Sequence, residues 1–424
     1  MGPSLSAWLA ATGVAEAAEP PPENPYVFVT DGAIGMEPGV RTANAVSKVV
    51  LAADDVLAEA VRLDESRPAG KAVGIAGRVA KGALLDVPLV LVQVSAVHEL
   101  LGHGARAREL DLDPTYTFRL VPPYRGLFSG PEEEDEVVRI ATTSYEESAV
   151  IDEDIAVELA GFEASAASVW WMQAGIAQRD GWMHVRDLLV YGAYRLDHVS
   201  TLAVNQGGPF DPATSNDVEA YLTTLQMRTN RWRSEDREAM GRNLQLGYLV
   251  GLADPLLWTT AYHAVVTHGV HGRRQARVAM PRVGGWSLLP ALRYSLTPFG
   301  PEHGVDLFAR RGEPLYNLYA RAATGGVLRS YGVGGRAFGL PVGDGRRLGG
   351  EVDLWWQPDL MFERLQAYDR PQQLGAQLGL HVDWPIAERV GLVGKLAYKT
   401  EGYVLAQPLG AGPVGYLGLS VAPR

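Results

Sequence analysis

Two histidines and a glutamate stand close together in residues 97–103, whose sequence is VHELLGH. Neutral imidazoles are good ligands for Zn2+, and a neighbouring glutamate can take a proton from a metal-bound water molecule. The histidines are five positions apart, so a regular α-helix would separate them by about 140° around its axis. A one-residue π-type bulge at Gly102 would bring both rings to one side. We therefore predict a zinc site with His98 and His103 as ligands and Glu99 as general base.

The third protein ligand has to come from elsewhere in the chain. Glu163 lies on a helix predicted over residues 151–171, among small residues that let two helices approach closely. Its carboxylate is expected to be buried, and a buried carboxylate needs a partner, which a metal ion could supply. Glu158 on the same helix is the alternative, as a ligand or as an acid that orients a histidine. Asp154 and Glu147 are further candidates.

The string HELLGH resembles the signature of the dipeptidyl peptidase III family of zinc peptidases. The resemblance covers about seven residues. It implies His98 and His103 as ligands, Glu99 as general base and a ligand glutamate on a later helix. The second motif of the family, a glutamate pair followed four residues later by another acid, is matched only at the pair, residues 146–147, because position 151 is Ile. We carry over the zincin-type metal chemistry and not the dipeptidyl specificity.

The composition excludes several kinds of site. The 424 residues contain no cysteine, which excludes disulfides, thiolate metal sites and cysteine nucleophiles. The net charge of −11 argues against nucleic acid as a partner, because nucleic-acid binding needs a concentrated basic surface. A chain of this length is expected to form about two or three domains.

The first residues resemble an export signal. Residues 7–14 form a short apolar run, and residues 15–17 (AEA) match a small-x-small cleavage site, although no Lys or Arg precedes them. Residues 19–25 are proline-rich and predict an extended linker. We therefore expect residues 1–26 to be a signal peptide and linker, with a short ordinary helix as the alternative.

The rest of the chain divides into two parts with different periodicity. Residues 27–271 predict helices, because apolar residues recur at spacings of three and four, and a very apolar stretch leads into the histidine motif. Residues 272–424 predict about eight strands, because apolar and polar residues alternate between glycine- and proline-rich turns. The prediction is an α+β multidomain fold, in which an all-helical metallopeptidase-like domain precedes an antiparallel β-barrel.

Residues 272–424 resemble a bacterial outer-membrane β-barrel. Each strand has one apolar face and one polar or glycine-rich face, and tyrosine and tryptophan lie near strand ends. Charged residues such as Arg293, Glu351 and Lys395 could then pair in the lumen. The resemblance implies membrane lipid around the barrel, localisation in the outer membrane and a periplasmic helical domain. A soluble β-sandwich, whose strands alternate in the same way, is the alternative.

Residues 246–266 form a second apolar run that is about long enough to span a membrane. Asp254 and Pro255 inside the run favour a buried helix hairpin. The flanks of the histidine motif also resemble site-2-type membrane proteases, in which Asp254 would be the third ligand. Those proteases have histidines four residues apart, which this chain lacks.

Three hypotheses follow. The first is an exported, membrane-associated zinc metallopeptidase that hydrolyses peptide or protein substrates, with Glu99 activating the water. The second is a non-enzymatic outer-membrane structural or transport protein whose helical domain is stabilised by a metal. The third is a site-2-like intramembrane protease that uses Asp254 as a ligand.

Overall fold

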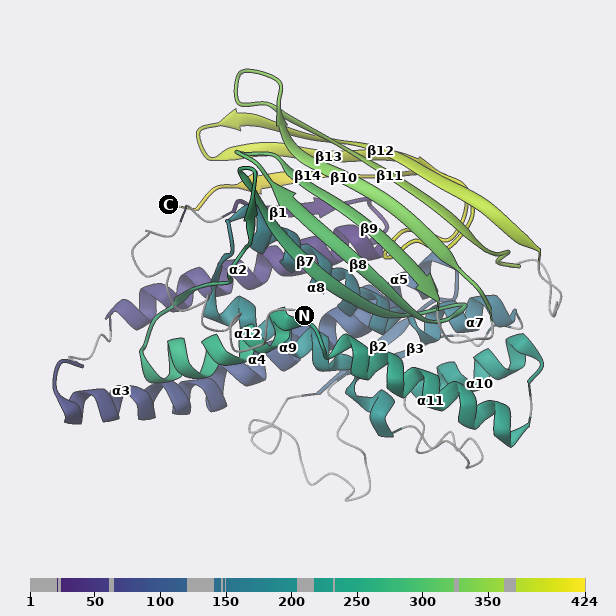
Figure 1. Ribbon diagram of the computed structural model, residues 1–424, viewed down its shortest axis with the longest axis horizontal. Coiled ribbons are helices and arrows are strands. Elements are labelled where there is room, and N and C mark those ends of the chain that lie inside the picture. Colours follow the sequence, from purple (N-terminus) through teal and green to yellow (C-terminus); the bar gives the residue numbers. More distant parts are fainter. Residues whose placement is uncertain are drawn as a thin grey trace.

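The computed structural model describes residues 21, 24–60, 65–119, 141–145, 148, 150–203, 217–231, 233–323, 328–361 and 371–423. Helices from the first part of the chain lie against one face of a large curved antiparallel sheet that comes mainly from the second part (Figure 1). The predicted order, helices followed by antiparallel strands, is therefore confirmed.

The helical part is built around α8, which is buried along most of its length. The helices are α2 (Met36–Ala60), α3 (Pro68–Lys81), α4 (Val87–Ala96), α5 (Gly104–Glu109), α7 (Ile151–Glu158), α8 (Ala160–Gln178), α9 (Val185–Leu196), α10 (Asp217–Thr229), α11 (Ser234–Gly251) and α12 (Pro255–Tyr262). Three π-helical segments, η1 (Gly82–Asp86), η2 (Val97–His103) and η4 (His263–Val270), and the 3-10 segment η3 (Asp197–Ala203) join some of them.

Residues Pro68–Glu109 run as one continuous helix through α3, η1, α4, η2 and α5. By length and composition alone this helix could cross a membrane, a test that the core helix of a soluble protein also passes. Pro68 stands at the first position of this helix, where its missing N–H removes no helical hydrogen bond, and Pro88 lies inside the helix, just after the π-helical segment η1. The helix carries the histidine motif near its C-terminal end.

The sheet has ten strands, and each pairs antiparallel with its neighbour. The spatial order is β1 (Tyr26–Thr30), β14 (Gly412–Val421), β13 (Val390–Lys399), β12 (Gln372–Ala387), β11 (Arg347–Pro358), β10 (Tyr331–Pro341), β9 (Leu315–Ala323), β8 (Gly300–Arg310), β7 (Trp286–Thr297) and β6 (Arg282–Val283). Two small sheets, β2 (Thr115–Phe118) with β3 (Ala141–Ser144) and β4 (Trp182–His184) with β5 (Gln275–Arg277), lie in the helical part.

The prediction of a closed barrel of about eight strands is wrong. Within the described residues the sheet stays open, with β1 and β6 as its two edges. Helix α8 packs against the inner face of β7, β8 and β9, and α2 packs beside β1. The sheet therefore wraps around helices, which occupy the space into which a small closed barrel would pack its own side chains.

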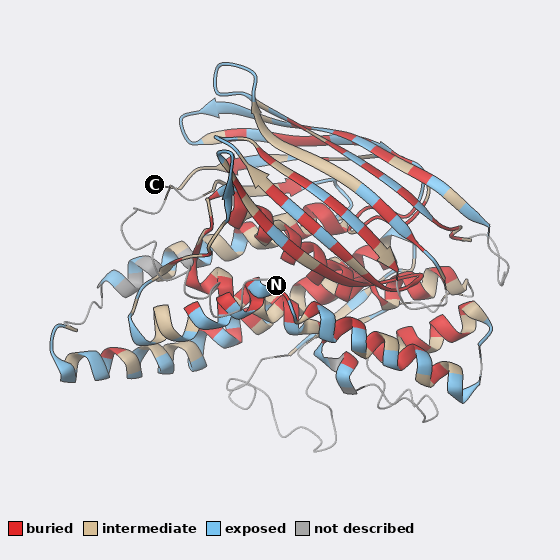
Figure 2. Cartoon of the chain, in the orientation of Figure 1, coloured by how far each residue is buried: buried red, intermediate tan, exposed pale blue. Residues whose placement is uncertain are grey.

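Buried and exposed positions alternate along the strands of the large sheet (Figure 2), and the side chains on its two faces differ in polarity. On β11, Glu351 and Asp353 are buried on the inner face, and Val352 and Leu354 are exposed on the outer face. Large exposed side chains on the outer face of β9–β14 are Leu318, Tyr331, Val333, Leu348, Val352, Leu354, Trp356, Leu374, Leu378, Leu380, Val382, Trp384, Leu392, Leu396, Tyr398, Leu417 and Leu419. The outward positions described on these strands carry no charged residue. In a soluble protein a sheet usually has apolar side chains on its buried face and polar ones on its exposed face, and this sheet has the reverse distribution.

Several buried charges on the inner face are paired, and some of these polar contacts join the sheet to the helices. Lys395 Nζ lies 2.8 Å from a carboxylate oxygen of Glu37 on α2 and 2.7 Å from one of Glu351. The indole N–H of Trp170 on α8 donates to Asp306, 3.1 Å away, which also binds Arg293 at 2.6 Å. The sequence-based expectation that inward charges pair is confirmed for these residues, with helices supplying some of the partners.

The apolar run over residues 246–266 is interrupted. Helix α11 ends at Gly251, and α12 begins at Pro255 after Asp254, whose carboxylate accepts a hydrogen bond from the backbone N–H of Leu256. The same carboxylate is fully buried and lies 2.7 Å from Arg195 on α9. The predicted break at Asp254 and Pro255 is confirmed. The prediction that the run is buried is only partly right, because Leu246, Val250 and Trp258 are each more than half exposed.

Candidate metal centre

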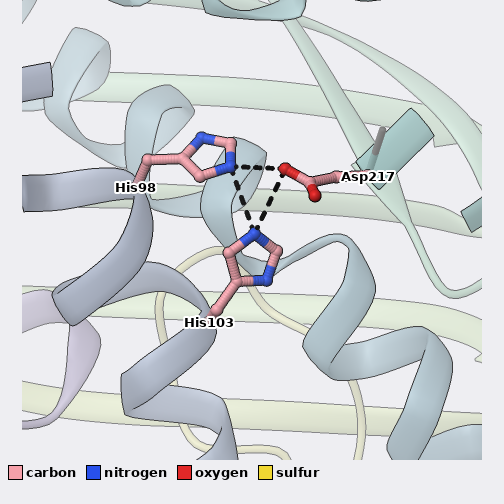
Figure 3. A group of neighbouring side chains, drawn as sticks. All are labelled: His98, His103 and Asp217. Carbon is pink, nitrogen blue, oxygen red and sulfur yellow. Dashed lines mark hydrogen bonds and ion pairs between the residues drawn. The ribbon is translucent and has the colours of Figure 1, made fainter. Parts of the chain in front are cut away.

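The histidine motif is π-helical over its whole length, Val97–His103. The wider π-helical turn cancels the extra residue between the histidines, as the sequence predicted. The rings of His98 and His103 consequently point toward each other, with their Nε2 atoms 3.1 Å apart (Figure 3). Both side chains are buried.

Two glycines let the motif approach α8. A Cβ atom added at Gly102 would lie 2.5 Å from the Cα of Gly161 and 2.6 Å from the carbonyl oxygen of Ala160. A Cβ added at Gly161 would lie 2.3 Å from Nε2 of His98. Gly102 is thus needed for the close crossing of two helices, and Gly161 leaves the space that the ring of His98 fills.

Asp217, the first residue of α10, completes the group. One oxygen of its carboxylate lies 2.9 Å from His98 Nε2 and 3.5 Å from His103 Nε2 (Figure 3). Four ligands arranged tetrahedrally at zinc bond lengths of about 2.0–2.1 Å are separated by about 3.3 Å. The three separations of 2.9, 3.1 and 3.5 Å therefore fit three corners of one such tetrahedron.

The outer nitrogen of each histidine is also bound. Nδ1 of His98 lies 2.8 Å from Asp197, whose carboxylate accepts a further hydrogen bond from Ser165 at 2.6 Å. Nδ1 of His103 donates to the carbonyl oxygen of Val157, 2.6 Å away. Because a carbonyl oxygen only accepts, this contact requires a proton on Nδ1 of His103, so that in the neutral ring Nε2 carries the lone pair. Metal-binding histidines are commonly oriented by partners of this kind.

The charges in the group favour a cation at its centre. Burial alone would lower the pKa of His98, but the carboxylates of Asp197 and Asp217 raise it well above its usual range. Partial burial likewise works against the carboxylate form of Asp217, and its contacts with the two histidines nevertheless lower its pKa below the usual range. Two Nε2 lone pairs 3.1 Å apart repel each other unless a proton or a metal ion lies between them.

No protein family model, curated protein or solved structure matches this chain. The chemistry of the centre therefore has to be argued from its geometry.

The predicted ligand Glu163 lies elsewhere. Its carboxylate is fully buried, as expected, but it lies 2.6 Å from Arg106 and accepts a hydrogen bond from the backbone N–H of Ala406 at 2.7 Å. The structure thus brings together His98 and His103 without Glu163, and the partner that its burial requires is an arginine.

The other predicted acids lie around the centre or outside it. Glu99 is half-buried, and its charge helps to raise the pKa of His103. Glu158 accepts a hydrogen bond from the hydroxyl of Tyr145 at 3.1 Å, and burial raises its pKa to about 7, with a further contribution from the charge of Asp217. Asp154 instead accepts a hydrogen bond from the backbone N–H of Ser148. Glu147 lies outside the described residues, and Asp254 is held by Arg195.

Sequence reasoning missed Asp217. Asp217 stands at the start of a helix, where acidic residues commonly interact with the helix dipole. An acid at this position therefore does not by itself indicate a metal ligand. It also lies more than a hundred residues beyond the histidine motif, and no spacing rule connects the two. A search limited to the helix that follows the motif could not have found it.

Proposed function

We propose that this chain is a zinc-dependent hydrolase of the metallopeptidase type, in which His98, His103 and Asp217 hold the ion. The observation that carries the proposal is the set of three converging donor atoms at tetrahedral separations, two of them from histidines with fixed outer partners. Catalytic zinc sites typically have three protein ligands and leave the fourth position to water or substrate. The side chain of Asp217 is 45% exposed, so we expect water or substrate to reach the centre from that side.

A zinc ion at this centre would supply Lewis acidity and lower the pKa of a water molecule in the open position. The chain itself supplies the proton acceptor and the orienting groups. Glu99, adjacent to His98 on η2, accepts the proton of the attacking water and returns it to the leaving amine. Asp197 and the Val157 carbonyl hold the imidazoles in place.

The test combines zinc analysis of the purified full-length chain with Glu99→Gln. We expect zinc in wild type and variant, and a loss of activity against a peptide library of about 10²–10⁴-fold in the variant. Glu238→Gln is the matched control, because Glu238 lies on the surface of α11 with a side chain that is 45% exposed. If Glu99→Gln keeps full activity, the mechanism is wrong.

A structural role for the metal is the alternative, and the burial of both histidines favours it. Structural zinc sites contribute directly to folding free energy. In that case chelation or His98→Ala unfolds the chain, and Glu99→Gln changes nothing measurable.

We also propose that the outer face of β9–β14 contacts membrane hydrocarbon, which would anchor the chain in a bacterial outer membrane with the helical part in the periplasm. The support is the exposed, uncharged apolar surface described above. From Leu374 to Trp384 on β12 the apolar positions cover ten residue steps. At about 3.3 Å per residue and a tilt of about 45° they would cover about 23 Å, close to the ~25 Å apolar band of membrane strands.

This anchoring is tested with phospholipid vesicles of neutral composition. We expect the wild-type chain to float with the vesicles and to resist a high-salt wash, because hydrocarbon contacts are not screened by salt. Arginine at an outward position near the midplane should cost about 2–4 kcal/mol of membrane stability, so Leu378→Arg should weaken flotation. Glu238→Arg is the control for added charge elsewhere. A wild-type chain that stays soluble and free of vesicles without detergent would contradict the proposal.

A further inference from the structure

A cavity of about 250 Å³ lies between the helices and the inner face of the sheet, apart from the metal centre. Its walls come from α2, from the C-terminal half of α8 and from inward positions of β10, β12 and β13. Trp171, in its wall, is ten residues along α8 from Gly161, which corresponds to about 15 Å at 1.5 Å per residue. The volume is slightly below that of typical small-molecule pockets, about 300–1,000 Å³.

Arg41 is the most distinctive side chain in the wall. Its guanidinium carbon lies 4.3 Å from the ring centre of Trp171 and 4.9 Å from that of Tyr416. The group donates one hydrogen bond to the Tyr416 hydroxyl. Among the described residues no carboxylate oxygen lies within 4.0 Å of the Arg41 guanidinium. Two acids, Asp187 and Asp383, line other parts of the same cavity. Stacking between two rings fixes a guanidinium and leaves N–H groups available to an anion.

A second donor stands one turn further along α2. The side-chain nitrogen Nδ2 of Asn44 is buried and has no hydrogen-bond partner among the described residues. Positions i and i+3 of a helix share a face, so Asn44 and Arg41 line the same wall. A buried amide without a partner is costly, and native structures usually explain one by a ligand or water. Four basic side chains line the described part of the cavity against two acidic ones, which favours an anion: Arg41, Lys48, Arg179 and Arg347 against Asp187 and Asp383.

The remaining wall is apolar. Trp171 and Met172 on α8 face Phe338 on β10 and Val393 on β13. An inorganic anion would leave this surface without contacts, and a neutral apolar molecule would leave Arg41 and Asn44 without acceptors. Both parts of the wall are satisfied together by a molecule with an oxyanion at one end and an apolar body at the other.

We propose that this cavity is a binding site for an anionic amphiphile, a carboxylate or phosphate carried on a short apolar chain, with Arg41 and Asn44 binding the oxyanion. Trp171 and Phe338 contact the apolar body. The site is independent of the proposed zinc chemistry, since it shares no residue with the metal centre.

The test is calorimetric titration of the full-length chain, in a neutral maltoside detergent where it needs one, with octanoate, octyl phosphate and octanamide. Octanamide has the same chain as octanoate but no charge. We expect octanoate or octyl phosphate to bind at least about 10-fold more tightly than octanamide, because the charge-assisted hydrogen bonds are lost with the neutral head. Mass spectrometry of a solvent extract of the purified chain distinguishes a free acid from a phospholipid as the natural source of the anion.

Arg41→Gln should weaken octanoate binding at least about 10-fold. The matched control is Arg346→Gln, which removes an exposed arginine that packs on Trp384 and does not line the cavity. Should Arg41→Gln fail to fold, Asn44→Asp serves in its place, because a carboxylate beside Arg41, in addition to Asp187 and Asp383, should repel the ligand and weaken binding by a similar factor. Glu99→Gln, which stays folded whether the metal is catalytic or structural, should keep octanoate affinity, and this separates the cavity from the zinc proposal. Equal affinity for octanamide, wild-type affinity in Arg41→Gln, or no binding of any probe overturns the inference.

Discussion

Gly161→Ala offers a test of the metal centre that changes none of its donor atoms. The added Cβ would lie 2.3, 2.4 and 2.5 Å from three ring atoms of His98, against ordinary contacts of about 3.5 Å. The ring would therefore have to move by more than about 1 Å, whereas zinc–nitrogen distances tolerate about 0.2 Å. Because even changes to the outer partners of ligands cost about 10–100-fold in metal affinity, we expect a loss of at least about 100-fold.

Gly161→Ala should lower the free energy of unfolding, whereas a glycine-to-alanine change at an unobstructed helix position raises it. Alanine in a helix interior is favoured over glycine by up to about 1 kcal/mol, whereas overpacking a buried site costs about 1–3 kcal/mol. Gly175→Ala on the same helix is the matched control, because its Cβ would meet only Asn24 Nδ2 at 3.7 Å. It should raise the unfolding free energy slightly and leave zinc affinity unchanged.

The assay is competition for zinc between the chain and a chromogenic chelator, with thermal unfolding of the metal-free chain recorded for each variant. If Gly161→Ala is folded and binds zinc as tightly as the wild type, His98 is not a ligand in this geometry. The reasoning from the close crossing of η2 and α8 would then be refuted.

Three further predictions concern acidic residues of the helical part. Asp197→Asn removes the charged partner of His98 Nδ1, so zinc affinity in the same competition assay should fall about 10–100-fold. In metal-free protein the raised pKa of Glu158, about 7, means that ionisation opposes folding: the penalty is absent below about pH 4 and complete above about pH 8. In urea denaturation, the free energy of unfolding of Glu158→Gln should therefore exceed that of the wild type by about 1–3 kcal/mol at pH 8. At pH 4 the two free energies should be equal. Asp254→Ala removes the carboxylate that neutralises the buried Arg195, so the unfolding free energy should fall by about 3–5 kcal/mol, while the folded fraction still binds zinc.

Each of these has a result that contradicts it. Unchanged zinc affinity in Asp197→Asn would mean that this carboxylate does not support the ligand. A stability difference for Glu158→Gln that does not vary with pH would show that its carboxyl titrates normally. Loss of zinc from folded Asp254→Ala would favour the intramembrane-protease hypothesis.

The histidine pair and the π-helical turn between its members could be predicted from the sequence, and the third member of the group, Asp217, could not. A five-residue histidine spacing has few solutions on one helix, so a π-helical turn follows from geometry alone, and the structure has it over Val97–His103. The burial of Glu163 also followed from its small neighbours. Its partner did not, because no pattern in the sequence connects Arg106, three residues after His103, with a glutamate 57 residues further along the chain. A carboxylate that must be neutralised can be satisfied by an arginine as well as by a metal.

The fold could also be predicted only in part: the inward and outward faces of the strands could, and the open sheet could not. Alternation along the C-terminal strands predicted which side chains face inward, because side-chain direction reverses at every residue of a strand. Closure of the sheet depends instead on what fills its concave side, and that is α8, a helix from the other part of the chain. The alternating pattern is identical for an open sheet over helices and for a closed barrel. Nothing local in residues 272–424 could distinguish them.

The pairing of β1 with β14 has a consequence for how the chain reaches this fold. Tyr26 pairs with Val421, so one edge of the sheet joins segments that are almost the whole chain apart. A ribosome delivers residues 26–30 long before their partner strand emerges, and such distant contacts form slowly. During that interval the edge of β1 has open hydrogen-bonding groups, which makes a chaperone or a provisional partner strand useful in synthesis.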